Sequence, residues 1–541
     1  MTRTRPEGTP LGDEFHVYDT TLRDGAQREG ISYSVADKLA VARLLDSLGV
    51  GFIEGGWPGA LPKDTEFFAR AASGELELKH AALVAFGATR KADTQAAQDP
   101  QVRALLDSAA PVITLVAKSD RRHIERALRT DVPTAAAMVA DTVRFLVGEG
   151  RRVFLDAEHF FDGYAHDPET ALRVLDAGVQ AGADVVVLCD TNGGQLPLGI
   201  AETVAEVGEK TGFRLGIHCQ DDTSCAVANS IAAVQAGASH VQCTANGYGE
   251  RAGNADLFGV LGNLVAKLDM PVLPEGAIGE LSRVSHGIAE LANIAPDPHS
   301  AYVGASAFAH KAGLHASAIK VDPLLYNHID PALVGNDMRV LVTEMAGRAS
   351  LELKGRELGV DLAARPEALT ASVDEVKRRE AAGWSYEAAD ASLELLLRRN
   401  AGEADAESAV FSLESYRVII DHAPDGSVVS EATVKLHVGG QRVIATAEGN
   451  GPVHAVDAAL RTALRPHLSW MDEVALADYK VRILAGAHGT DAVTRVLLDS
   501  ADGAREWTTV GVHENIVEAS WLALTDALAH KAYRVRTETK G

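Results

Sequence analysis

Residues His16–Gly30 read HVYDTTLRDGAQREG, and they open a series of short apolar stretches that each end in polar residues. The segment His16–Tyr18 has the composition of a β-strand, and the chain then runs into Arg23 and Asp24. An arginine supplies a planar cation for a carboxylate or a developing oxyanion, and an aspartate supplies a hard oxygen ligand for a divalent metal. A single Arg-Asp-Gly motif fits a strand-end turn with a surface ion pair equally well, so the other strand ends must decide.

Seven more apolar stretches follow at intervals of about 30 residues, with helical patterns between them. Ser34 and Asp167 are predicted helix starts, and Gly49 and Gly182 are predicted helix stops. Eight strands alternating with helices predict an α/β fold, a (β/α)8 TIM barrel, over residues 1–272. A doubly wound open sheet is the alternative, although no Gly-x-Gly-x-x-Gly motif opens the first helix. The predicted strands lie at 16–19, 51–56, 81–87, 111–117, 152–158, 185–191, 215–220 and 240–246.

Polar side chains gather where these predicted strands end. Active sites of such barrels lie at the C-terminal ends of the strands, so these residues should share one mouth. A barrel with a purely structural role would have no reason to concentrate such residues there. The strand-end residues include Arg23, Asp24, Glu54, Glu158, His159, Asp190, Thr191, Asn192, His218, Gln220 and the segment 244–254.

The strand rhythm stops near Leu273, and residues 273–408 are predicted to be a mainly helical linker, with helices over 359–369 and 375–396. The small, acidic segment Asn400–Ser408 resembles an inter-domain linker. Residues 409–541 then show two rounds of three strands and a helix, whose helices share the similar segments ALRTAL and ALTDAL. This C-terminal α+β domain with a repeated βββα unit carries no catalytic constellation, so a regulatory or dimerisation role is favoured.

Composition excludes several classes of partner. The chain has 541 residues, a formal net charge of −24 and 46% hydrophobic residues, so it should form large cores and should not bind nucleic acid. No apolar run approaches about 20 residues, so no membrane span is expected, and the N-terminus lacks the apolar region of a secretory signal. The four cysteines show neither zinc-ribbon nor Cys-x-x-Cys spacing, which fits a reducing cytoplasm.

Three motifs together resemble a known family: DTTLRDGAQ (19–27), HCQDD (218–222) and NGYGERAGN (246–254). They are similar to the acyl-CoA-condensing synthases that include 2-isopropylmalate, homocitrate and citramalate synthases. The likeness covers essentially the whole chain, since GNGPVHAVDAAL (449–460) and the segment 511–528 resemble the amino-acid-sensing regulatory domain of these enzymes. Within the family, IEGGWPGALPKDTEFF (53–68) and FLDAEHFFDGY (154–164) look most like the citramalate synthase branch.

The resemblance implies a Claisen-type condensation of acetyl-CoA with a 2-oxo acid, expected to be pyruvate, which gives (R)-citramalate and CoA for isoleucine biosynthesis. 2-Isopropylmalate synthesis from 2-oxoisovalerate is the alternative, followed by an acyl-CoA lyase and an inactive barrel kept as a binding protein. The resemblance also assigns the residues. Arg23 is the electrostatic catalyst and also binds substrate, Glu158 and Thr191 are substrate-site residues, His315 is a catalytic histidine, and Tyr326 assists it. In the mechanism, His315 is the candidate base or proton shuttle, oriented by Glu158 or Tyr326.

The metal set departs from the family pattern. By resemblance Asp24, His218, Gln220 and Asn254 are the ligands, but the family usually has a second histidine where this chain has Gln220. An amide oxygen can bind a hard cation and is a poor zinc ligand. The set therefore favours Mg²⁺ or Mn²⁺ over Zn²⁺. Trp57, just after Glu54, either shortens the pocket to fit a methyl group or packs beneath its loop.

The C-terminal repeat is expected to bind an effector in a seam between its two units. Gly449 and Asn450 belong to one glycine-containing turn, and Gly511 and His513 to the other. Each turn precedes a predicted helix, whose N-terminal amides suit the carboxylate of an amino acid. By resemblance the effector is isoleucine, and the chain is expected to be a homodimer. The alternative is a domain that only dimerises.

Overall fold

The structure is a computed structural model that describes residues 12–343, 345–403, 410–484 and 492–538. The chain divides into two compact units. One consists of Met1–Phe308 with Ile329–Asp337, and the other of Ala309–His328 with Met338–Gly541. The division into three parts at residues 272 and 408 stays a prediction, and most of the expected linker Asn400–Ser408 lies outside the described residues.

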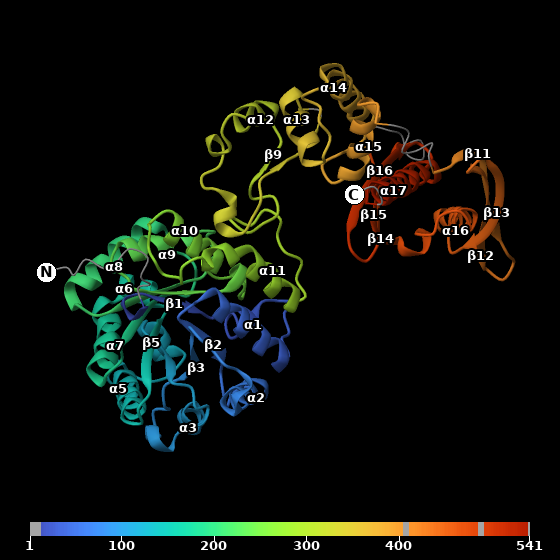
Figure 1. Ribbon diagram of the computed structural model, residues 1–541. Coiled ribbons are helices and arrows are strands. Elements are labelled where there is room, and N and C mark those ends of the chain that lie inside the picture. Colours follow the sequence, from blue (N-terminus) through green and yellow to red (C-terminus); the bar gives the residue numbers. More distant parts are fainter. Residues whose placement is uncertain (1–11, 344, 404–409, 485–491, 539–541) are drawn as a thin grey trace. The chain divides into compact units, whose positions relative to one another are not determined.

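Eight parallel strands close into a barrel in which each strand pairs with its neighbour in sequence (Figure 1). The pairing of His16 with His240 and of Asp19 with Cys243 joins the last strand to the first. The predicted (β/α)8 fold is therefore confirmed, and the open sheet is wrong. The strands are β1 (His16–Asp19), β2 (Phe52–Gly56), β3 (Ala82–Ala88), β4 (Val112–Lys118), β5 (Arg152–Glu158), β6 (Val185–Asp190), β7 (Leu215–Cys219) and β8 (His240–Cys243).

The barrel helices begin and end at the residues that the sequence indicates. Ser34 caps α1 with a capping box, in which its hydroxyl accepts from the Asp37 N–H and the Asp37 carboxylate accepts from the Ser34 N–H. Gly49 and Gly182 end α1 and α7 with φ of 90° and 108°, a conformation that favours glycine. The helices are α1 (Val35–Leu48), α2 (Pro62–Arg70), α3 (Pro100–Asp107), α4 (Arg121–Arg126), α5 (Val132–Gly148), α6 (Phe160–His166), α7 (Pro168–Ala181), α8 (Pro197–Thr211), α9 (Ala226–Gln235) and α10 (Leu257–Ala266).

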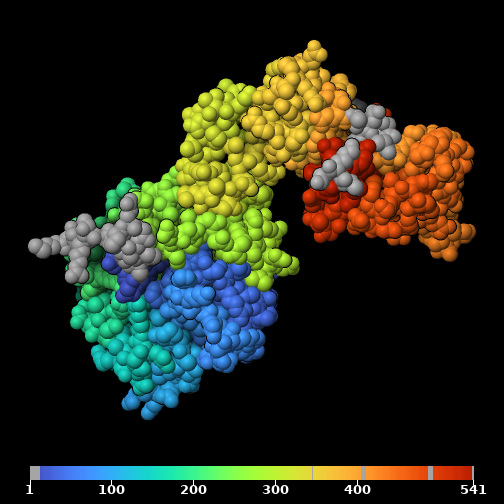
Figure 2. All heavy atoms as spheres, viewed as in Figure 1, coloured from blue at the N-terminus to red at the C-terminus, as the bar shows by residue number. Residues whose placement is uncertain are grey.

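Two apolar layers stabilise the barrel. One lies between the strands and the helices that surround them. From outside, the segments coloured blue to green in Figure 2 form a continuous surface over this layer. The other lies inside the barrel at the N-terminal ends of the strands, where Phe52 and Phe154 meet edge to face at 5.2 Å beside Tyr18. This packed floor leaves the C-terminal ends of the strands as the place for a cavity. Among the described residues, no helix combines the length and apolarity needed to cross a bilayer.

The predicted helical linker is partly correct. Helix α11 (Leu281–Leu291) packs on the barrel through Leu281, Val284 and Ile288. The expected helix over 359–369 is wrong for its first half, because α14 begins at Pro366. The expected helix over 375–396 is broken, since α14 ends at Ala381 and Gly383 has a φ of 100°. The other elements are β9 (Ala309–His310), α12 (Gly313–Ile319), β10 (Arg339–Val340), α13 (Arg348–Glu357), α14 (Pro366–Ala381) and α15 (Asp390–Asn400).

The repeated βββα unit is confirmed. Each repeat is a three-stranded antiparallel sheet with one helix on its inner face (Figure 1). In the first repeat, Val434 and Leu436 pack on Val456 and Leu460 of the helix. The first repeat contains β11 (Ser412–His422), β12 (Val428–Val438), β13 (Gln441–Gly449) and α16 (Pro452–Leu464). The second contains β14 (Ala475–Ile483), β15 (Thr494–Ala501), β16 (Glu506–His513) and α17 (Ile516–Glu538).

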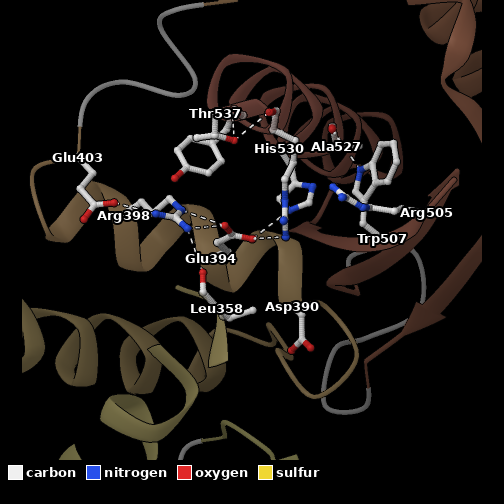
Figure 3. A network of polar contacts seen from close by, with 12 residues as sticks. Leu358, Asp390, Glu394, Arg398, Glu403, Arg505, Trp507, Ala527, His530 and Thr537 are labelled. Carbon is white, nitrogen blue, oxygen red and sulfur yellow. Dashed lines mark hydrogen bonds and ion pairs between the residues drawn. The ribbon is translucent and has the colours of Figure 1, made fainter. Parts of the chain in front are cut away.

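A buried ionic network joins helix α15 to helix α17 (Figure 3). Glu394, only 2% exposed, accepts from Arg398 Nε at 2.9 Å, and its second oxygen lies 3.0 Å from His530 Nε2 and 3.4 Å from Arg534 Nη2. Arg398 also donates to Glu403 at 2.7 Å. Removing one partner from a buried network of this kind leaves uncompensated charge. Helix α15, although it precedes the repeats in sequence, is therefore bound to the second repeat.

Candidate active site

A cavity of about 670 Å³ opens at the C-terminal ends of the barrel strands. All of its lining residues belong to the barrel unit. The strand-end clustering in the sequence is thus matched by a shared cavity. Of the predicted site residues, Arg23, Asp24, Glu158, Thr191, His218 and Gln220 line it.

Arg23 is held in one orientation by carboxylates and an aromatic ring. Its Nε is ion-paired with Glu54, which is fully buried, and its Nη1 lies 3.2 Å from Asp24 Oδ1. The guanidinium carbon lies 3.8 Å from the centre of the Phe86 ring. Burial works against the charge, but Glu54 and Asp24 raise the pKa of Arg23, so the side chain is a fixed cation at the cavity.

Asp24 is the centre of a buried cluster formed with two other segments of the barrel, the end of β7 and the loop after β8. Its Oδ2 accepts from Asn254 Nδ2 at 2.6 Å and lies 3.4 Å from both His218 Nε2 and Gln220 Nε2. Burial opposes ionisation, yet Arg23 and His218 hold the pKa of Asp24 below its usual range. Burial lowers the pKa of His218, against the opposing effect of the Asp24 carboxylate. The four predicted metal ligands are therefore brought together.

The chemistry of this cluster fits a divalent cation. Gln220 Oε1 and Asn254 Oδ1 are buried and have no hydrogen-bond partner, and the NH₂ groups of the same two amides face the anionic Asp24 Oδ2. In the described part of the chain, no group of three or more His, Cys, Asp and Glu residues is arranged to hold a metal. The set fits a hard cation because it joins one carboxylate and one imidazole to two amide oxygens.

Glu158 and Thr191 also line the cavity, where β5 and β6 end. Glu158 is ion-paired with Lys118, and both side chains are about one-quarter exposed. The next residue, His159, has a φ of 60°, and its N–H donates to the Thr191 hydroxyl at 2.8 Å. This bond uses an acceptor site of Thr191 and leaves its hydroxyl hydrogen available to a ligand.

Comparison with known proteins agrees with this geometry. Residues 14–287 match the HMGL-like family, residues 302–382 match the homocitrate synthase post-HMGL domain-like family, and residues 387–532 match the LeuA allosteric (dimerisation) domain. Over 527 residues the chain is 62% identical to the (R)-citramalate synthase of Streptomyces coelicolor, an alignment that covers 97% of this chain and 98% of that protein. The chain belongs to the citramalate synthase family.

Two further relatives separate the branches of this larger group. The (R)-citramalate synthase of Aquifex aeolicus is 44% identical over 98% of this chain and 99% of its own length. The 2-isopropylmalate synthase of Methanocaldococcus jannaschii is 30% identical over 96% of this chain and 95% of its own length. The resemblance to the citramalate synthase branch that the motifs indicate is confirmed.

Glycines explain the spacing of the family motif NGYGERAGN. A Cβ at Gly249 would lie 2.2 Å from Asn254 Oδ1, and a Cβ at Gly253 would lie 2.1 Å from the Gly247 carbonyl oxygen. Gly253 also has a φ of 106°. The loop after β8 is thus compact only because these positions lack side chains, and this compactness places Asn254 against Asp24.

His315 and Tyr326, the predicted proton-transfer pair, lie in the second unit. Their rings are stacked with centroids 4.2 Å apart, and His310 lies edge-on to both rings. Tyr326 is 41% exposed. The structure therefore brings these two residues together, while their action at the barrel site stays a prediction.

Trp57 lines the cavity and is also packed against its loop. Its ring meets Phe86 edge to face at 5.3 Å, and its backbone N–H donates to Asp64 at 2.8 Å. The indole N–H is buried without a hydrogen-bond partner. Trp57 is thus part of the cavity wall, and whether it shortens the pocket stays a prediction.

Four residues of the site carry no role in the sequence prediction: Glu54, Phe86, Asp156 and Gln242. Glu54 lies in the middle of β2 and pairs with Arg23, and Phe86 stacks on that same arginine. Asp156 lines the cavity two residues before Glu158. A period of two on one strand could have identified Asp156, because alternate residues face the same side of a sheet. The partners of Glu54 and Gln242 lie on other strands, so no local signal marks them.

The predicted effector residues lie in different repeats. Gly449 ends β13, and the Asn450 N–H donates to His454 Nδ1 at 3.1 Å. The expected turn at Gly511–His513 is wrong, because both residues belong to β16 and the connection to α17 is at 514–515. Gly511 is required there by close packing, since its Cβ would lie 2.0 Å from the Ala519 carbonyl oxygen. Among the described residues, no hydrogen bond or ion pair joins the two glycine-containing segments.

Proposed function

We propose that this chain condenses acetyl-CoA with pyruvate and water to give (R)-citramalate and CoA. The observation that carries this proposal is the 62% identity, over nearly the whole of both chains, to the (R)-citramalate synthase of Streptomyces coelicolor. The site supports it, because a fixed arginine and a buried cluster of hard ligands share one cavity.

Arg23 is the proposed electrostatic catalyst. When the acetyl carbon attacks the keto carbon of the 2-oxo acid, negative charge develops on the former keto oxygen. Arg23 already faces the cavity and is held by Glu54 and Phe86, so little reorganisation is needed to stabilise this alkoxide. Preorganised donors of this kind contribute about 3–4 kcal/mol to the transition state.

Asp24, His218, Gln220 and Asn254 are the proposed ligands of a divalent metal. A cation held by these residues would polarise the keto and carboxylate oxygens of the 2-oxo acid. Because three of the four ligand atoms are oxygens, Mg²⁺ or Mn²⁺ is proposed in preference to Zn²⁺. The two buried amide oxygens without partners support this assignment.

The remaining residues bind substrate and move protons. Thr191 is proposed to donate its hydroxyl hydrogen to the carboxylate of the 2-oxo acid, and Glu158 is proposed to orient the proton carrier. His315, stacked on Tyr326, is the proposed group that removes a methyl proton from acetyl-CoA. Hydrolysis of the resulting thioester releases CoA and makes the reaction irreversible.

The test is release of free CoA thiol from acetyl-CoA in the presence of separate 2-oxo acids. We expect fast release with pyruvate and little with 2-oxoisovalerate, because Trp57 and Phe86, which line the cavity with Arg23, are proposed to leave room for a methyl group and none for an isopropyl group. A preference for 2-oxoisovalerate would identify a 2-isopropylmalate synthase and leave the mechanism intact. Absence of thiol release with every oxo acid, in a folded protein supplied with Mg²⁺, would favour an inactive barrel that binds a ligand.

We further propose that the chain works as three parts, with a catalytic barrel at 1–272, a linker at 273–408 and a regulatory domain at 409–541. The match to the LeuA allosteric (dimerisation) domain supports a homodimer with a bound effector, for which isoleucine is proposed. The edge strands β11 and β14 expose Ile420 and Ile483, which suits association with a second copy. Four free cysteines support the cytoplasm as its location.

The proposed effector residues are Gly449, Asn450, Gly511 and His513. His513→Ala and Asn450→Ala should weaken inhibition by isoleucine about tenfold or more while leaving turnover without isoleucine unchanged. His422→Ala, on the exposed end of β11, is the control and should keep the inhibition midpoint. An unchanged midpoint in both test variants would place the effector site elsewhere.

A further inference from the structure

Three buried side chains form a hydrogen-bonded row across the barrel interior. Asp156 lies on β5, Gln242 on β8 and His218 on β7. The Gln242 NH₂ donates to Asp156 Oδ1 at 2.8 Å, and His218 Nδ1 lies 2.9 Å from Gln242 Oε1. The three residues are 4%, 1% and 7% exposed, so water does not compete for these bonds.

The row determines which nitrogen of His218 carries the hydrogen. An amide oxygen only accepts, so His218 Nδ1 must be the donor to Gln242 Oε1. Nε2 is then the nitrogen whose lone pair is free to bind a cation. This Nε2 lies 3.4 Å from Asp24 Oδ2. A divalent cation held by both atoms would take this lone pair and the negative charge of the carboxylate.

Asp156 in turn determines the direction of the Gln242 amide. If the amide were rotated by half a turn, its NH₂ would face His218 and its oxygen would face Asp156. The Asp156 oxygen that accepts from the Gln242 NH₂ favours the observed orientation.

We propose that Gln242 and Asp156 are positioning residues that hold His218 in the tautomer and orientation in which Nε2 faces a divalent cation. This inference rests on the proposed metal site. Partners in this position usually change metal affinity 10- to 100-fold when they are lost. Neither residue touches the cation, since Gln242 acts through His218, and Asp156 acts through Gln242.

The test measures Mn²⁺ binding to the full-length chain by equilibrium dialysis. Gln242→Met keeps the side-chain length and removes the amide, and Asp156→Leu removes the acceptor. Both should raise the Mn²⁺ dissociation constant about 10- to 100-fold. Asp156→Asn keeps an acceptor oxygen and should stay within about threefold of the unaltered chain. This rescue by the conservative variant would not occur if Asp156 acted only by filling space.

A second readout needs no metal. With ¹⁵N-labelled histidine, the His218 signals are identified by their loss in His218→Asn. The metal-free chain and Asp156→Asn should show the form protonated at Nδ1, while Gln242→Met should show a mixture of the two tautomers. If Gln242→Met lacks a cooperative thermal transition, the Asp156→Leu and Asp156→Asn pair carries the comparison.

The outcomes separate this inference from the proposed function. If the unaltered chain binds Mn²⁺ and folded Gln242→Met or Asp156→Leu binds it equally well, the positioning role is wrong and the metal site stands. Equal weakening in Asp156→Asn and Asp156→Leu would also overturn it, because the acceptor oxygen would then be irrelevant. Absence of Mn²⁺ binding by the unaltered chain would overturn both proposals.

Discussion

Gly249→Ala should disable the active site without touching a charged residue. The new Cβ would lie 2.2 Å from Asn254 Oδ1 and 3.1 Å from its Cγ, whereas ordinary contacts begin at 3.4 Å. The amide must therefore move by about 1.2 Å. That movement breaks the 2.6 Å hydrogen bond from Asn254 to Asp24 and displaces a proposed metal ligand. A misplacement of about 1 Å in an active site costs on the order of 100-fold in rate.

The assay is the initial rate of CoA thiol release at saturating pyruvate and acetyl-CoA, with Mn²⁺ affinity measured in parallel. Gly148→Ala, at the end of α5, is the matched control, because its Cβ would meet no atom within 4 Å. It should keep full turnover and be slightly more stable, by about 0.4–1 kcal/mol. Wild-type turnover and Mn²⁺ affinity in Gly249→Ala would refute the idea that the bare backbone of this loop positions Asn254.

Four other outcomes are expected. Arg23→Lys should lower kcat by about 10²–10³, because a single ammonium charge replaces the planar guanidinium that Glu54 and Phe86 hold in place. Arg28→Lys is the control, and a smaller loss of kcat in Arg23→Lys would show that Arg23 does not stabilise the transition state. Exhaustive chelation should abolish turnover, Mg²⁺ or Mn²⁺ should restore it better than Zn²⁺, and full activity without metal would contradict the mechanism. His16 has its pKa lowered to about 4 by burial and by Arg214, so the unfolded chain binds a proton that the folded chain does not. The free energy of unfolding should fall by up to about 3 kcal/mol as the pH drops from 6.5 to 4. Urea unfolding at several pH values measures it, and the free energy of unfolding of His16→Gln should depend less steeply on pH over this range. Glu394→Gln should destabilise the second unit by on the order of 3 kcal/mol in thermal unfolding. Glu403 is more exposed, so Glu403→Gln should destabilise it by much less, and equal effects would contradict a buried network centred on Glu394.

Local patterns predicted the barrel well because its elements are decided locally. Ser34 and Asp167 cap helices, and Gly49 ends one, through atoms a few residues away in sequence. The strand ends could be grouped into one site because parallel strands in a barrel share a mouth. The barrel topology and the family motifs suffice to predict one metal site from four residues, although neither gives a distance. These residues are Asp24, His218, Gln220 and Asn254.

The predictions that are wrong or missing depend on backbone conformations and on contacts between distant segments, which local sequence patterns do not reveal. Gly383 interrupts a region with strong helical composition, because the chain takes a φ of 100° between α14 and α15. Gly511 looks like a turn residue, yet it sits inside β16, where α17 approaches too closely for a side chain. Nothing in the sequence around Gln242 distinguishes it from other polar residues, because its proposed role depends on His218 and Asp156, which lie on two other strands.

The two βββα repeats are alike in chain order and unequal in their surroundings. On β16, Val510 and Val512 are buried in a core with Leu393 and Leu397 of α15, so linker helices cover the outer face of the second sheet. On the first sheet, Ile444 points outward and is 52% exposed. Opening the second sheet would expose a hydrophobic core on each of its faces together with the Glu394 charges, whereas opening the first sheet would expose the core on its inner face alone. The second half of the pseudo-symmetric pair is thus anchored on both faces and the first half on one, and amide hydrogens of β11 should exchange with solvent before those of β16.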